Sequence, residues 1–171
     1  MILPLGARRR EIERLFARTA AAFGSPVPPP RTRGDGGRLR EYALFTRDHA
    51  EEVLGGEGNL RALEGRLFST AKTLGDDYRL RLKVRGARDA MAAARLIYRG
   101  LGIDFRGSAG GKVVIRRCAF APVYTPRICA LMSALDRGLL SGLTEGGVLE
   151  FRQRITEGPD SCRACFTGRK R

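Results

Sequence analysis

The sequence lacks the residues and motifs that would point directly to an activity. It has no tryptophan and a single histidine, His49. No GxGxxG or GxxxxGK[ST] pattern is present, and no serine lies in a GxSxG elbow. A nucleotide-binding loop and a serine-hydrolase site are therefore not indicated. With no partner base beside it, His49 is expected to be an exposed helix residue, and we lean toward a non-catalytic role for the chain.

Long hydrophobic runs are also missing. No segment approaches the roughly 18 consecutive apolar residues that a membrane helix needs. At the start of the chain, three arginines at positions 8–10 follow a very short apolar piece, the reverse of the order in a secretory signal. We therefore expect a soluble, cytoplasmic protein with no membrane span.

Negative charge is scarce relative to positive charge. The chain has 32 Lys and Arg residues against 18 Asp and Glu, which gives a formal net charge of +14. Such a balance is typical of nucleic-acid-binding proteins, but these cations are spread along the chain, nearly all are arginine, and few aromatics accompany them. We therefore favour a solvated basic surface. Nucleic acid stays an alternative partner, with its candidate contacts in one segment: Arg79, Arg81, Lys83 and Arg85.

The first 37 residues are expected to be a helix and a linker attached to one domain, residues 38–171. Apolar residues recur at helical spacing over 9–23, and the proline-rich segment that follows Gly24 cannot continue a helix. This helix has an apolar stripe that needs cover, so it should pack on the body or on a second subunit. Thr46 is predicted to cap a helix over 47–54.

A strand is predicted where apolar and basic residues alternate, over 78–85. A continued helix is the alternative there, because leucine and arginine favour helices. A helix follows. After it, a β-hairpin with a glycine-rich turn is predicted, and its second strand ends just before Cys118. Thr125 and Pro126 carry the signature of a helix start.

This last predicted helix extends to about Leu143. Its glycines at 138 and 142 lie on one face and would let another backbone approach closely. Two strands, over 149–155 and 161–167, are predicted to end the chain.

All four cysteines lie in the last third of the chain, at Cys118, Cys129, Cys162 and Cys165. In a cytoplasmic protein such cysteines are more often metal ligands or core residues than disulfides. The Cys162–Cys165 spacing is that of a chelating pair in zinc and iron–sulfur sites. We therefore predict that the four bind Zn²⁺ or a [4Fe–4S] cluster. The alternatives are a partial site that includes Glu150, or cysteines without a metal role. Residues 162 and 165 of a strand point to opposite faces, so sharing a metal would require a turn or bulge.

A longer pattern covers residues 113–167. It consists of a strand that ends in Cys118, a helix opened by Thr125 and Cys129 with glycines at 138 and 142, a strand with Glu150, and a turn before Cys162. In this pattern the chain resembles the 4-vinyl reductase family of small-molecule-binding domains, which is related in fold to a subunit of the TRAPP vesicle-tethering complex.

The resemblance implies an α/β (α+β) fold, with an antiparallel sheet packed against helices and the N-terminal helix as an added arm. It also implies a homodimer and an apolar pocket for a hydrophobic small molecule. Plausible pocket linings are Met91, Tyr98, Leu131 and Leu135.

The resemblance also bears on the metal site. Aromatic-sensing regulators of the family hold zinc with a helix cysteine, a strand glutamate and two later cysteines, a pattern that matches Cys129, Glu150 and Cys162. Gln153 stands where the family has its remaining cysteine. Cys118 and Cys165 are extra and could supply the lost ligands.

Three functions are therefore considered. The first is a non-catalytic small-molecule-binding or sensory domain stabilised by a cysteine-bound metal. The second is an iron–sulfur redox protein or electron carrier, and the third is a basic nucleic-acid-binding module.

Overall fold

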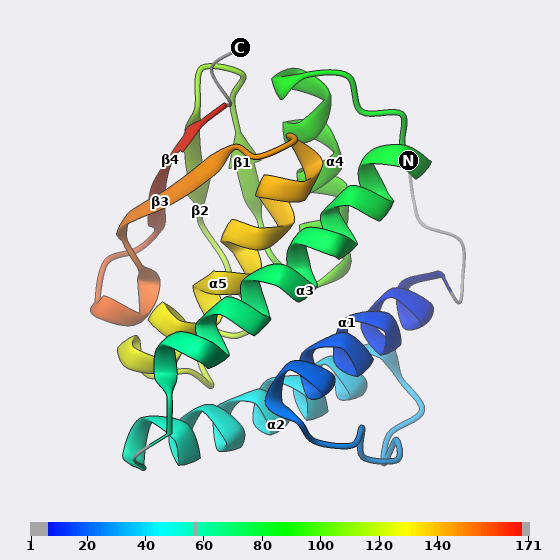
Figure 1. Cartoon of the computed structure of the whole chain (residues 1–171), viewed down its shortest axis with the longest axis vertical. Helices are drawn as coiled ribbons and strands as arrows, with labels where there is room; N and C mark the ends of the chain where they lie inside the picture. The colour runs from blue at the N-terminus through cyan, green and yellow to red at the C-terminus, as the bar shows by residue number, and fades with distance from the viewer. Residues whose placement is uncertain (1–6, 57, 169–171) are drawn as a thin grey trace.

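The computed structural model describes residues 7–56 and 58–168, which form an α+β fold of helices against an antiparallel sheet, as predicted (Figure 1). In chain order the elements are α1 (Ala7–Phe23), α2 (Asp35–Gly55), α3 (Leu60–Arg81), α4 (Ala87–Gly100), β1 (Phe105–Gly107), β2 (Lys112–Ile115), α5 (Pro126–Leu143), β3 (Val148–Gln153), the 3-10 turn η1 (Ile155–Glu157) and β4 (Cys162–Thr167). None of the described helices is both long and apolar enough to cross a membrane.

The sheet has the strand order β1-β2-β4-β3, with every neighbouring pair antiparallel. At its centre Ile115 of β2 lies opposite Cys162 of β4. Buried and exposed residues alternate along β4, because successive side chains of a strand point to opposite faces. Cys162, Ala164 and Phe166 belong to the core, and the residues between them face away from it.

Helix α5 begins where the sequence predicts. Pro126 is its first residue, and the Thr125 hydroxyl oxygen accepts a hydrogen bond from the amide of Ile128 at 3.3 Å. This cap satisfies one of the amides left without a partner at a helix start. The helix extends to Leu143, also as predicted.

Helices α3 and α5 pack with their backbones in close contact at glycines. A Cβ atom added to Gly138 would meet the carbonyl oxygen of Phe68, and one added to Gly142 would meet that of Lys72. From the other side, a Cβ on Gly75 would meet the carbonyl oxygen of Leu139. The predicted close approach at Gly138 and Gly142 is therefore confirmed, and α3 is the partner.

The strand predicted over residues 78–85 is wrong. Helix α3 continues through Arg81, and the chain then turns at Lys83, which has a positive φ of 53°. Burial near the end of α3 follows helical spacing: Leu74 and Tyr78, four residues apart, are both buried. Leu80, whose position in the alternation suggested burial, is 68% exposed.

The predicted helix start at Thr46 is also wrong, because α2 is continuous from Asp35 to Gly55. The Thr46 hydroxyl is buried inside the fold, where it donates to a carbonyl oxygen of the preceding turn and bonds the hydroxyl of Tyr124 at 2.6 Å. A threonine within a helix often bonds back to the preceding turn in this way. The predicted domain boundary at residues 37 and 38 consequently falls inside a helix.

The N-terminal helix packs on the body of the protein. Ile12, Phe16 and Ala20 of α1 are buried with Leu39 and Tyr42 of α2. A buried cation reinforces this contact: Arg38 is 1% exposed, donates two hydrogen bonds to Glu13 of α1, and donates a third to Glu41. The helix is thus an integral part of the described fold.

Candidate ligand-binding site

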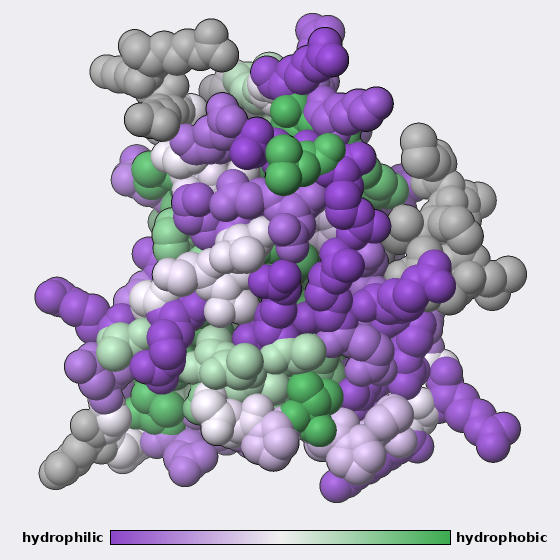
Figure 2. All heavy atoms as spheres, turned by 45° about the vertical axis from the view of Figure 1, so that its right-hand side comes forward, coloured by the Kyte–Doolittle hydropathy of each residue, from purple (hydrophilic) through white to green (hydrophobic). Residues whose placement is uncertain are grey.

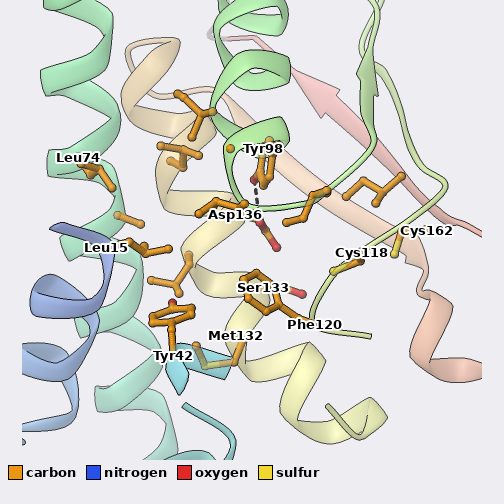
Figure 3. A pocket seen from close by; sticks show the side chains of 18 of the residues that line it. Leu15, Tyr42, Leu74, Tyr98, Cys118, Phe120, Met132, Ser133, Asp136 and Cys162 are labelled. Atoms are coloured by element: carbon orange, nitrogen blue, oxygen red, sulfur yellow. Dashed lines mark hydrogen bonds between the residues drawn. The ribbon is translucent and has the colours of Figure 1, made fainter. Parts of the chain in front are cut away.

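An apolar cavity of about 200 Å³ lies inside the fold (Figure 3). All five α-helices and the strands β2, β3 and β4 contribute to its walls. The walls are predominantly hydrophobic; the apolar side chains include Leu15, Leu74, Ile97, Leu101, Met132, Leu135, Leu139 and Phe151. The cavity therefore offers an environment for a hydrophobic molecule.

Three charged residues of the lining, Arg8, Glu11 and Arg81, mark one rim of the cavity, where α1 meets the ends of α3 and α4. The Tyr78 hydroxyl of α3 donates a hydrogen bond to Glu11 of α1. The Arg8 guanidinium donates to the carbonyl oxygen of Gly100 at 2.7 Å, and Arg81 lies 3.7 Å from Glu11. Polar contacts thus hold α1 across this side of the cavity.

One carboxylate lies within the cavity. Asp136 of α5 accepts a hydrogen bond at 2.7 Å from the hydroxyl of Tyr98, on α4 (Figure 3). Burial raises the pKa of Asp136 to about 6, although the Tyr98 hydroxyl and the charges of Arg154 and Arg137 lower it. The pKa of Tyr98 is raised well above its usual range, first by burial and then by the Asp136 charge.

Three of the four cysteines line the same cavity: Cys118 from the loop after β2, Cys129 from α5 and Cys162 from β4. Burial raises the pKa of Cys118 to about 12 and that of Cys129 to about 11, and it also raises the pKa of Cys162. The thiolate is the reactive form of cysteine. At neutral pH these three groups are therefore uncharged thiols that add to the apolar character of the walls.

The fourth cysteine lies on the other side of the sheet. Cys165 is exposed, and its partner on the neighbouring strand β3 is Glu150. Glu150 is exposed too and pairs with Arg152 at 3.2 Å. The cause is the regular strand conformation of β4, in which residues 162 and 165 point to opposite faces. The two candidate ligands Cys165 and Glu150 are thus separated from the three cysteines of the cavity.

This arrangement does not fit a metal ion or cluster shared by all four cysteines. Within residues 7–56 and 58–168, no group of three or more Cys, His, Asp or Glu side chains is placed to hold a metal ion. The zinc or iron–sulfur site therefore stays a prediction from the spacing and the resemblance, without support from the geometry.

The exposures of the cysteines predict their reactivity. At pH 7.5 in the native protein, one thiol, Cys165, should react rapidly with a disulfide reagent. Cys118, Cys129 and Cys162 should react at least about 100-fold more slowly, because Cys162 is buried, the other two are half-buried, and all three are protonated. Thiol titration followed by mass spectrometry measures this, and Cys165→Ser should remove the fast phase. Protection of all four cysteines until a chelator is added would contradict the arrangement and indicate a shared metal.

The predicted pocket residues divide into two groups. Tyr98 and Leu135 line the cavity. Met91 packs in the main core, and Leu131 packs in a second cluster with Leu63 and Leu67 of α3. Leu135, one turn after Leu131 on α5, contacts both clusters.

His49 does not lie in the cavity. It is half-buried rather than exposed, with its Nε2 atom 2.8 Å from the Ser25 hydroxyl and its Nδ1 atom 3.0 Å from the Phe45 carbonyl oxygen. Its ring also contacts the rings of Phe23 and Phe45. These contacts give it a structural role between α2 and the end of α1.

The candidate nucleic-acid residues do not share a strand face, because the segment is a helix end and a turn. Arg79 pairs with Glu145 at 2.9 Å, and Arg81 lies near Glu11. Lys83 and Arg85 are exposed beyond the helix. Figure 2 shows a largely hydrophilic face on which hydrophobic side chains stand in small separate groups.

Asp136, the carboxylate that lines the cavity, is not among the site residues predicted from the sequence. A signal for it exists: it is a carboxylate within the apolar stripe of the predicted helix, with Met132, Leu135 and Leu139 around it. Helical spacing places it on the same side as Met132 and Ser133, which also line the cavity.

Comparison with known proteins adds no relative. No protein-family model matches the chain, and no curated protein matches it. The likeness to the 4-vinyl reductase family therefore rests on the sequence motifs and stays a prediction.

Proposed function

We propose that this protein is a non-catalytic domain of 4-vinyl reductase type that binds a small hydrophobic molecule in the cavity between its helices and its sheet. The observation that carries the proposal is the mainly apolar cavity of about 200 Å³. Protein interiors are normally packed as densely as organic crystals, so a space of this size is unusual.

The energetic cost of such a space supports an occupant. In closed engineered cavities each Å³ costs about 24 cal/mol, so a space of about 200 Å³ left empty costs at most on the order of 5 kcal/mol, and less where water enters from the rim. This is comparable with the whole stability of many domains. A bound apolar molecule would recover much of it through contacts with the walls.

The size of the cavity limits its occupant. An engineered cavity of about 150 Å³ holds benzene. A space of about 200 Å³ therefore suits a molecule with one ring and a short chain, or an alkyl chain of similar volume.

The chemistry of the walls supports binding rather than catalysis. Catalytic thiols need a depressed pKa or an adjacent base, whereas the pKa values of Cys118, Cys129 and Cys162 are raised. No histidine is among the lining residues that the structure describes. The lining thus offers apolar contact and hydrogen bonds, without an activated nucleophile.

Calorimetric titration with propylbenzene tests this function. We expect the metal-free, ligand-free protein to bind it with a Kd of about 0.1 mM, which corresponds to roughly 0.6 kcal/mol per non-hydrogen atom. Leu135→Trp places an indole in the cavity and should weaken binding at least about tenfold. Leu60→Trp, the same change at a residue that is 41% exposed, should leave it unchanged. Equal binding by both variants, or no binding by the wild-type protein, would contradict the proposal.

A further inference from the structure

The carboxylate of Asp136 is out of place in an apolar cavity. Moving an ionised group out of water is unfavourable unless it is paired, and polar groups in protein interiors normally have at least one hydrogen-bond partner. Asp136 is half-buried and lines the cavity. Its carboxylate therefore favours a ligand that offers a positive charge or a hydrogen-bond donor.

Tyr98 satisfies only part of this carboxylate. Its hydroxyl donates to Oδ1 of Asp136 at 2.7 Å, and among the residues that the structure describes no hydrogen bond reaches Oδ2. A phenol also supplies no positive charge, because the pKa of Tyr98 is raised and the group stays neutral. The contact fixes the direction of the carboxylate but does not neutralise it.

The nearest cations have other partners. Arg137 pairs with Glu64. Arg154 pairs with Glu157 at 3.4 Å, donates to the Ser133 hydroxyl at 3.3 Å and lies over the Phe151 ring. Within the described part of the chain, no lysine or arginine forms an ion pair with Asp136. Asp136 thus presents an oriented carboxylate to the cavity, with Arg154 and Arg137 acting on it only from a distance.

We infer that the ligand of this cavity is a hydrophobic amine, whose protonated nitrogen binds the free oxygen of Asp136 while its apolar body fills the space along Leu135 and Leu139. This inference rests on the proposed function and adds the chemical class of the ligand. A protonated amine provides both elements that Asp136 lacks, a hydrogen-bond donor and a positive charge. A neutral hydroxyl would provide only the first.

Three molecules of one shape test the inference: 2-phenylethylamine, 2-phenylethanol and propylbenzene. At pH 7.5 Asp136 is ionised, since its pKa is about 6, and the amine is protonated, since alkylamines titrate near pH 10. Calorimetric titration of the wild-type protein should give the tightest binding for the amine. We expect its Kd to be at least about tenfold below that of propylbenzene, with the alcohol between them.

Variants identify the residue responsible. Asp136→Asn keeps the shape and can still accept the Tyr98 hydrogen bond, but it removes the charge, so the preference for the amine should disappear while propylbenzene still binds. Asp160→Asn is the matched control. Asp160 is exposed in the turn before β4, and this change should preserve the preference.

The outcomes separate the inference from the proposed function. If the wild-type protein binds propylbenzene as tightly as the amine, the inference is wrong and the proposed function stands. The inference is also wrong if the amine preference survives in Asp136→Asn. If none of the three molecules binds, both are wrong. The wild-type comparison decides the matter even if Asp136→Asn does not fold.

Discussion

Arg38→Met is expected to lower the free energy of unfolding by about 3 kcal/mol, because it removes the buried cation that joins α1 to α2. Arg38 is 1% exposed and donates to both Glu13 and Glu41. Without it, Glu41 loses its ion pair, and Glu13 keeps only its contact with Arg9 at 2.9 Å. We take the lower end of the usual range for broken buried pairs, since the Glu13 side chain is 37% exposed and water can reach it.

Urea unfolding monitored by circular dichroism measures this effect. A matched control is Arg152→Met, since Arg152 pairs with Glu150 on the exposed face of the sheet and should contribute little. Adding Glu13→Gln and Glu41→Gln to Arg38→Met should restore part of the lost stability, because the two carboxylates that Arg38 bonds in the wild type are then neutral. An Arg38→Met protein as stable as the wild type would contradict the packing of α1 on the body.

The same contact predicts a pH dependence. Hydrogen bonds from Arg38, opposed by burial, hold the pKa of Glu13 below its usual range. A carboxyl with a lowered folded-state pKa stabilises the protein above its unfolded pKa of about 4.3, and this stabilisation is lost as the pH falls through the folded value. The difference in stability between wild type and Arg38→Met should therefore be full at pH 7 and shrink below about pH 4.

Gly138→Ala is expected to cost about 3 kcal/mol, at the upper end of the range for overpacked cores. The added Cβ would meet the backbone carbonyl oxygen of Phe68 and would lie 3.0 Å from both the Ala71 Cβ and the Lys72 amide nitrogen. Backbone atoms of a packed helix cannot rotate away as a flexible side chain can. Helices α3 and α5 would have to separate, which would loosen every contact between them.

Gly65→Ala is the control for this substitution. Gly65 lies on the exposed side of α3, and a Cβ there meets nothing within 4 Å. Alanine is the better helix former, so this variant should gain about 0.5 to 1 kcal/mol. Thermal unfolding should shift in opposite directions for the two variants. A similar shift for both would contradict the close backbone contact between α3 and α5.

Local signals in the sequence predict much of the fold. Thr125 and Pro126 mark the start of α5 because the cap and the first-turn proline act within a few residues of each other. Gly138 and Gly142 predict a close backbone contact for a similarly local reason, although only the structure identifies α3 as the partner.

The two wrong secondary-structure predictions, the strand over 78–85 and the helix start at Thr46, have a common physical origin in tertiary packing. The alternation over 78–85 fits a strand as well as a helix end, and the burial of Tyr78 against α1 favours the helix. Thr46 has the side chain of a cap, but its hydroxyl bonds to its own helix and to Tyr124, which is distant in sequence.

The candidate site is harder to predict than the elements that build it. The cavity exists because side chains from five helices and three strands leave space between them, and no single segment encodes that space. The spacing of Cys162 and Cys165 suggests a chelating pair, whereas the strand places them on opposite faces. Asp136 becomes conspicuous only when the walls around it are known to be apolar.

The central claim, that an open apolar cavity lies between the helices and the sheet, is tested most directly by diffraction from a crystal held under xenon gas. Xenon enters dry apolar cavities and marks them by its scattering. We expect a xenon peak beside Leu135 and Leu139 in the wild-type protein and its loss in Leu135→Trp. A wild-type crystal without xenon at this position, with the walls in direct contact, would show that the cavity does not exist.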